Sequence, residues 1–84
     1  MLLKRIKYLN DYKFLCVFQN KEKVIWNAEK SLKRYKVWSI IKEDLSNLKI
    51  EDGILIYRFS EKENDYFDIC PDFIYMEGDK YVDR

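Results

Sequence analysis

The chain contains no histidine, only two glycines and one proline, and two cysteines among its 84 residues. Histidine is the side chain whose ordinary pKa lies nearest neutral pH, so its absence removes every Ser-His and Cys-His dyad. Two glycines cannot build a phosphate-cradling loop. A zinc site would need more thiolates than the chain has. We therefore expect a protein that is not an enzyme and binds no metal or other cofactor.

The two cysteines, Cys16 and Cys70, stand in different segments and form no CxxC pair. We expect two reduced thiols, as in a cytosol, with a disulfide between them as the alternative. Residues 1–7 reach charge too early for a signal peptide, and no apolar run approaches the length of a membrane span. The expected location is cytoplasmic, without a membrane partner.

Aromatic residues are abundant, with two Trp, seven Tyr and five Phe. A chain so rich in rings is not disordered, even though 37% of its residues are charged. Its length predicts a single domain, residues 1–84, at a size where only about 60–65% of the unfolded surface is buried. A homodimer would bury more.

Charge is divided unevenly along the chain. Residues 1–42 hold eleven Lys and Arg against three Asp and Glu, which gives +8, and residues 43–84 hold five against twelve, which gives −7. One explanation is that the halves interleave in one sheet and neutralise each other across strands. The other is a bipolar surface that can steer a charged partner.

The longest run of strand-favouring residues is 12–18, with turn-like residues on both sides. Phe14, Cys16 and Phe18 share one face of such a strand, and Leu15 and Val17 share the other. A strand apolar on both faces belongs at the centre of a sheet. Residues 3–9 and 23–27 read as its neighbours, and the short connections predict a three-stranded antiparallel meander.

A helical spacing follows this meander. Apolar residues recur at intervals of 3, 3, 3, 4 and 3, namely Leu32, Tyr35, Trp38, Ile41, Leu45 and Leu48. This stripe predicts either one helix over residues 30–46 or two short helices broken near residues 36–39. Either arrangement would pack on one face of the sheet.

The second half predicts a hairpin. Asp52-Gly53 forms a turn, residues 54–59 and 66–69 are strands, and Pro71 opens a short helical turn over residues 71–76. From Glu77 onward we expect a frayed tail. The predicted fold class is therefore α+β: an antiparallel sheet of about five strands, with one or two short helices on one face.

Two sets of residues are candidates for binding. The acidic and aromatic C-terminal set would engage a protein through carboxylates and rings; it comprises Tyr66, Asp68, Asp72 and Tyr75. The basic set would contact phosphates; it comprises Lys30, Lys33, Arg34 and Lys36. Because the acidic half would repel a polyanion, protein binding is the leading hypothesis and nucleic acid the alternative. A small-molecule pocket between helix and sheet has no residue pattern behind it.

Two segments carry a family resemblance: Asp11-Tyr12-Lys13-Phe14 with Phe18, and Asp68-Ile69-Cys70-Pro71-Asp72-Phe73-Ile74-Tyr75. They resemble the domain of unknown function 2442 family of small bacterial proteins, from about residue 6 to 77. The resemblance implies an α+β fold with an N-terminal antiparallel meander, short helices and a further hairpin. Some members are fused to a helix-turn-helix domain, and others are suspected toxin–antitoxin partners.

These observations lead to one functional hypothesis. We expect a non-catalytic bacterial module that binds a small protein partner, as an antitoxin-like or regulatory protein, or that self-associates as a homodimer. The alternative is a regulatory protein associated with nucleic acid through the basic helix face.

Overall fold

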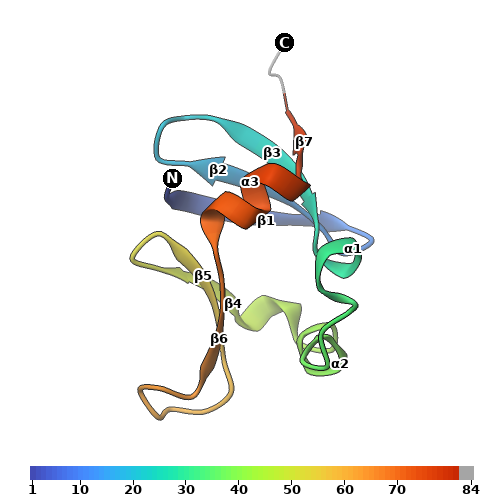
Figure 1. The fold of residues 1–84 in the computed structure, drawn as a ribbon, viewed down its shortest axis with the longest axis vertical. Coiled ribbons are helices and arrows are strands. Elements are labelled where there is room, and N and C mark those ends of the chain that lie inside the picture. The colour runs from blue at the N-terminus through green and yellow to red at the C-terminus, as the bar shows by residue number, and fades with distance from the viewer. Residues whose placement is uncertain (82–84) are drawn as a thin grey trace.

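Two antiparallel sheets and a set of short helices make up the fold in the computed structural model, which describes residues 1–81 (Figure 1). The first sheet has the order β1-β2-β3-β7, and the second has the order β4-β5-β6. The strands of the first sheet are β1 (Leu3–Asn10), β2 (Lys13–Phe18), β3 (Lys23–Asn27) and β7 (Asp79–Lys80). The N-terminal three-stranded meander is confirmed.

Strand β2 lies between β1 and β3, as the sequence predicts. Its side chains Phe14, Cys16 and Phe18 are buried in the core. On its other face Val17 is buried and Leu15 is half-buried. The β1–β2 turn places Asp11 and Tyr12 at φ 48° and 63°, the backbone of the tight turns that join antiparallel strands.

The stripe of apolar residues forms two short helices rather than one. These are α1 (Ala28–Leu32) and α2 (Trp38–Ile41), followed by the 3₁₀ turn η1 (Leu45–Asn47). The amide of Tyr35 donates to the Leu32 carbonyl at 2.9 Å, and that of Trp38 donates to the Tyr35 carbonyl at 3.0 Å. Such i→i+3 bonds eclipse side chains three residues apart. Residues spaced by three do not stay on one face of a straight α-helix, which has 3.6 residues per turn. The repeated spacing of three therefore indicates consecutive tight turns.

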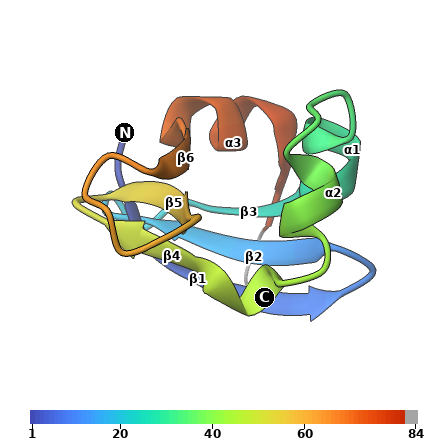
Figure 2. The ribbon, with the colours of Figure 1, turned by 90° about the horizontal axis from the view of Figure 1, so that it is seen from below.

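A second meander follows. It consists of β4 (Leu48–Glu51), β5 (Ile54–Arg58) and β6 (Tyr66–Ile69), and it leads into helix α3 (Pro71–Glu77). Pro71 begins α3 as expected. Helices α1, α2 and α3 lie on one side of strands β1, β2 and β3, and no helix of residues 1–81 lies on the other side (Figure 2).

The strand count and the single sheet of the sequence-based prediction are wrong. The described chain has seven strands in two sheets rather than about five in one. Strand β4 is short and follows the helical stripe without a break, so its Leu48 was assigned to that stripe. Strand β7 pairs with β3 where a frayed tail was expected. Residues 82–84 of that tail lie outside the described residues.

One hydrophobic core joins the two sheets and the helices. It includes Trp26 from β3, Leu32 from α1, Leu55 from β5, Ile69 from β6 and Ile74 from α3. The two charge halves do not interleave, because the first sheet takes only β7 from the second half within residues 1–81. No helix in this part of the chain has the length and apolar character needed to cross a membrane.

Candidate functional site

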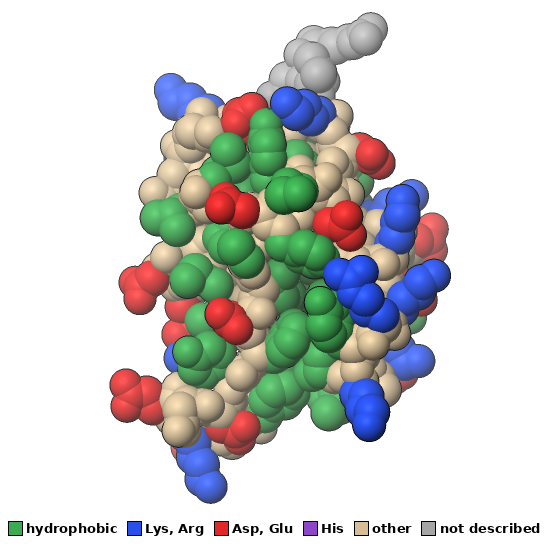
Figure 3. Space-filling view, in the orientation of Figure 1, with side chains coloured by type: hydrophobic (Ala, Val, Ile, Leu, Met, Phe, Trp, Pro, Cys, Tyr) green, Lys and Arg blue, Asp and Glu red, His purple; other side chains and the backbone are tan. Residues whose placement is uncertain are grey.

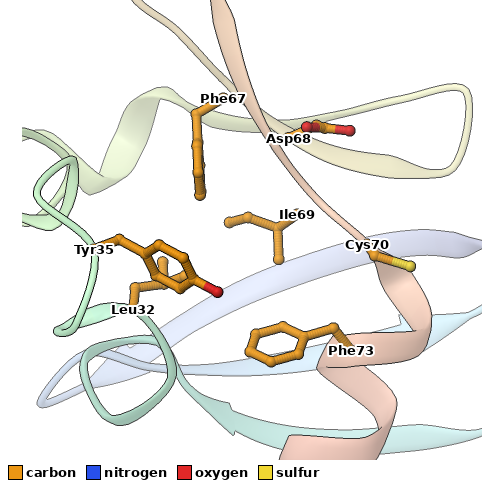
Figure 4. A pocket seen from close by; sticks show the side chains of 7 residues that line it. All are labelled: Leu32, Tyr35, Phe67, Asp68, Ile69, Cys70 and Phe73. Carbon is orange, nitrogen blue, oxygen red and sulfur yellow. The ribbon is translucent and has the colours of Figure 1, made fainter.

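An apolar groove of about 340 Å³ opens between α3, β6 and the segment that joins α1 to α2. Figure 4 shows its side chains converging from these three elements. They are Leu32, Tyr35, Phe67, Asp68, Ile69, Cys70 and Phe73. Leu32 and Ile69 are buried and form the floor, while the rings of Tyr35, Phe67 and Phe73 form the walls and stay partly accessible.

Local structure explains why these side chains meet. Alternation along β6 turns Phe67 and Ile69 inward and leaves Asp68 on the opposite face. Figure 4 shows the Asp68 carboxylate at the rim, directed away from the hollow. The tight turns between α1 and α2 hold Tyr35 against Phe67, with ring centroids 6.1 Å apart. Because Pro71 fixes the first turn of α3, Phe73 faces the other two rings.

Arg34 lies at the mouth of the groove. Its guanidinium carbon is 5.1 Å from the Tyr35 ring centroid and 5.8 Å from the Phe73 ring centroid. One of its terminal nitrogens also donates to the Tyr35 hydroxyl at 3.5 Å. A guanidinium held between two rings keeps most of its donors directed toward solvent. It is therefore placed to receive a carboxylate next to an apolar hollow.

Charge differs between the two sides of this face. Figure 3 shows apolar side chains along its middle, with Lys and Arg gathered over the α1–α2 side and Asp and Glu spread over the other. The groove therefore has a basic rim that includes Arg34 and an acidic rim that includes Asp68. This is the bipolar arrangement that the charge division suggested.

The predicted acidic and aromatic set does not form one surface. Tyr66 and Asp68 both lie on the outer face of β6, where Asp68 borders the groove and Tyr66 lies under the Arg58 guanidinium at 5.4 Å. Asp72 is 3.3 Å from the α-amino group of Met1. Two members of the set therefore already have local partners away from the groove.

Tyr75 has its own partners on the other side of α3. Its hydroxyl donates to Glu22 at 2.9 Å, and its ring packs edge-on against Phe18. Hydrogen bonds from Tyr75 and Asn20 lower the pKa of the Glu22 carboxyl, and Lys80 adds to this effect. Interactions with Tyr75 and Glu22 raise the pKa of Lys80. This cluster ties the β2–β3 turn to α3 and β7.

The predicted basic set is also divided. Arg34 stacks at the groove mouth, while Lys30 lines a separate hollow with Glu77 and Asp79. Lys33 and Lys36 are exposed on the same segment. The structure thus brings together one member of each predicted set, Arg34 and Asp68, on opposite rims of one groove.

Sequence reasoning missed Tyr35 as a groove residue. The apolar stripe placed it toward the sheet, yet 42% of its surface is exposed. Phe67 and Phe73, which also line the groove, were likewise not among the candidate binding residues. The spacing of three before Trp38 is the available signal, because it points to tight turns that carry Tyr35 outward.

The lining of the groove is mostly apolar and aromatic. It holds one carboxylate on its rim and one exposed thiol, Cys70. Across residues 1–81, no three His, Cys, Asp or Glu side chains gather closely enough to hold a metal ion. Cys16, the other thiol, is buried, and both cysteines are free.

Fold and groove together define a small α+β protein with two antiparallel sheets and an aromatic surface groove. No family model, curated protein or solved structure matches the chain.

Proposed function

We propose that the protein is a non-catalytic binding module that receives a small protein partner in the groove between α3, β6 and the α1–α2 segment. The observation that supports this proposal is the meeting of three partly accessible rings over a buried aliphatic floor. Aromatic side chains and arginine are the residues enriched at protein interfaces and in their energetic hot spots.

The groove chemistry also suggests what the partner presents. A volume of about 340 Å³ admits one or two large apolar side chains, and Arg34 at the mouth matches a carboxylate beside them. Asp68 on the opposite rim matches a basic residue. The partner segment is thus an apolar anchor flanked by charges of both signs.

The proposed role is that of an antitoxin-like or regulatory protein in a bacterial cytoplasm. This part of the proposal follows the resemblance to the domain of unknown function 2442 family. Self-association through the same groove is the competing mode of protein binding, because a face with a basic and an acidic rim is complementary to its own copy under two-fold rotation.

The first prediction concerns the groove rings. The tagged chain is purified from its native host, any partner in a stable ratio is identified and purified, and its affinity for variants is measured by calorimetry. Tyr35→Ala should weaken binding at least about tenfold, the usual cost of losing a hot-spot ring. It should leave folding intact, since this ring is 42% exposed.

Tyr66→Ala is the matched control, because Tyr66 is 43% exposed on the other face of β6. Equal losses in both variants, or a loss only in Tyr66→Ala, would contradict a groove-based interface. Sedimentation analysis of the chain alone distinguishes the homodimer, whose mass should fall to that of a monomer in Tyr35→Ala.

A further inference from the structure

The face of the first sheet that no helix covers is strongly basic. Phe14, Cys16 and Phe18 point into the core, so their neighbours Lys13, Leu15 and Val17 point outward. The register sets Arg5 beside Val17 and Lys7 beside Leu15, which places their side chains on the same outer face. On the other neighbouring strand, β3, Lys23 pairs with Val17, which places its side chain on this outer face as well.

An irregularity in β1 increases this charge. Leu3 pairs with Phe18 and Arg5 with Val17, so Lys4 is an extra residue in the ladder. Consecutive strand residues normally point to opposite faces, but a bulge redirects a side chain. Lys4 and Arg5 consequently line one hollow of about 360 Å³, together with Lys21 and Lys23.

The N-terminal part of the chain, which forms β1, β2 and β3, has a positive net charge. Residues 1–27 hold six Lys and Arg against two Asp and Glu, a net charge of +4. Within residues 1–81, Lys4, Arg5 and Lys7 form no salt bridge. Asp79, opposite Ile25 on the short strand β7, lines a hollow at the margin of this face together with Glu77 and Lys13.

Protection of an edge strand does not account for the pattern. Lysines on an edge strand discourage pairing with another chain, and that explains charge on β1. Lys13 and Lys21, however, lie on the central strand and on the turn after it. A face with cations spread over three strands and a turn is an electrostatic surface rather than a guarded edge.

We propose that this uncovered face binds duplex nucleic acid through its phosphate backbone. Its strand residues on β1, β2 and β3 include no aromatic side chain, and Tyr81, whose amide donates to the Lys23 carbonyl, is an exposed ring only at its margin. The face therefore lacks a row of rings on which single-stranded bases could stack. Its outward apolar residues are the aliphatic Leu15, Val17 and Ile25, which lack the large anchors typical of protein interfaces. Backbone contact by charge is the recognition mode that remains.

The acidic half of the molecule does not prevent this contact. In Figure 1 the second sheet extends away from the first, and its β4–β5 turn is the part that reaches β1, where the Leu3 amide donates to the Gly53 carbonyl. Residues 48–69 hold three Lys and Arg against six Asp and Glu, a net charge of −3. At physiological ionic strength, charges are screened over about 8 Å. The acidic second sheet therefore repels a bound duplex only weakly.

The test measures the binding of a 20-base-pair duplex DNA probe by fluorescence anisotropy at a series of salt concentrations. The second prediction is a dissociation constant in the non-specific range of roughly 10⁻⁴ to 10⁻⁶ M near physiological salt. Arg5→Gln/Lys7→Gln should make the negative slope of log association constant against log salt less steep by about 1.8. It should also weaken the affinity roughly tenfold or more in 50 mM salt.

Lys33→Gln/Lys36→Gln removes the same charge from the exposed segment between α1 and α2 and is the matched control. Equal losses in the two double variants would overturn the assignment of the face, as would the absence of binding in 20 mM salt. Unlabelled DNA, polyglutamate and anionic phosphatidylglycerol vesicles are also compared as competitors at equal charge. If polyglutamate or the vesicles compete as effectively as DNA, the face binds an acidic protein or a membrane, and the proposal of duplex binding is overturned. Thermal unfolding confirms that each variant is folded.

Discussion

Cys16 illustrates how strongly a single buried side chain is defined by its surroundings. It lies on β2 with none of its surface exposed, and its sulfur is 3.9 Å from the Phe14 carbonyl. Burial raises the pKa of this thiol from 9.0 to about 12, because a thiolate would lose its hydration there. Cys70, in contrast, is exposed at the start of α3.

The third prediction follows from this contrast. At pH 8 an aromatic disulfide reagent should titrate one thiol per native chain and two per unfolded chain, since the thiolate is the reactive form. Because the folded pKa of Cys16 is the higher one, its contribution to stability is complete below pH 9 and is lost as pH rises toward 12.

Cys70→Ser is the control for this experiment and should abolish the native reaction. A native chain of this variant that reacts as fast as the unfolded one would show that Cys16 is not sequestered.

Ser31 shows the same dependence on context for a polar group. The Trp26 indole nitrogen donates to its hydroxyl oxygen at 2.9 Å, and the hydroxyl donates to Glu77 at 3.5 Å. These bonds join β3, α1 and α3 through one buried hydroxyl. Because its hydroxyl has hydrogen-bond partners, burying Ser31 in the core does not leave an unsatisfied polar group.

At the scale of elements, the β4–β5 turn connects the two sheets. The amide of Leu3 donates to the Gly53 carbonyl at 2.8 Å, so the turn of the second sheet pairs with the first strand of the chain. Gly53 has φ +81°, a conformation that residues with a side chain rarely adopt. The turn glycine predicted from sequence thus also forms an inter-sheet contact.

The fourth prediction concerns this glycine. A Cβ at position 53 would lie 2.7 Å from the Cβ of Leu2, and the backbone angle would be strained. Gly53→Ala should lower the free energy of unfolding by about 1–3 kcal/mol, as measured by urea denaturation.

Asp52→Gly in the same turn provides the comparison. Asp52 also has positive φ, at 52°, and glycine adopts that angle freely, so the change should stay under about 1 kcal/mol. A Gly53→Ala chain as stable as the unmodified one would show that the close approach to Leu2 is easily relieved.

At the scale of the whole molecule, one core crosses both sheets and all three α-helices. The groove is lined from α3, β6 and the α1–α2 segment, and these elements lie on the helix-covered side of β1, β2 and β3 (Figure 2). The basic residues of the first sheet point to the other side. A partner in the groove and a duplex on the basic face would therefore not compete for space.

The fifth prediction is that the protein unfolds in one cooperative step. Because the sheets share their core, tryptophan fluorescence and far-ultraviolet circular dichroism should give coincident urea transitions. Core amides of β2 and β5 should exchange with similar free energies. Earlier exchange in β4, β5 and β6 would show that the second sheet opens independently.

The sequence by itself determined the local structure of this protein. The alternation in residues 12–18 places β2 at the centre of a meander, the residues at 52 and 53 define a turn, and Pro71 begins a helix. Each of these features depends on side chains that are close to one another along the sequence. Local preference is therefore sufficient to predict them.

Only the tertiary structure decided what these elements build. The pairing of β7 with β3 joins positions more than fifty residues apart, and a two-residue strand carries no periodic signal. The groove likewise combines residues 32–35 with 67–73, and the bulge at Lys4 gathers four cations around one hollow. Such surfaces arise from long-range packing in three dimensions, which the spacing of residues along the chain does not encode.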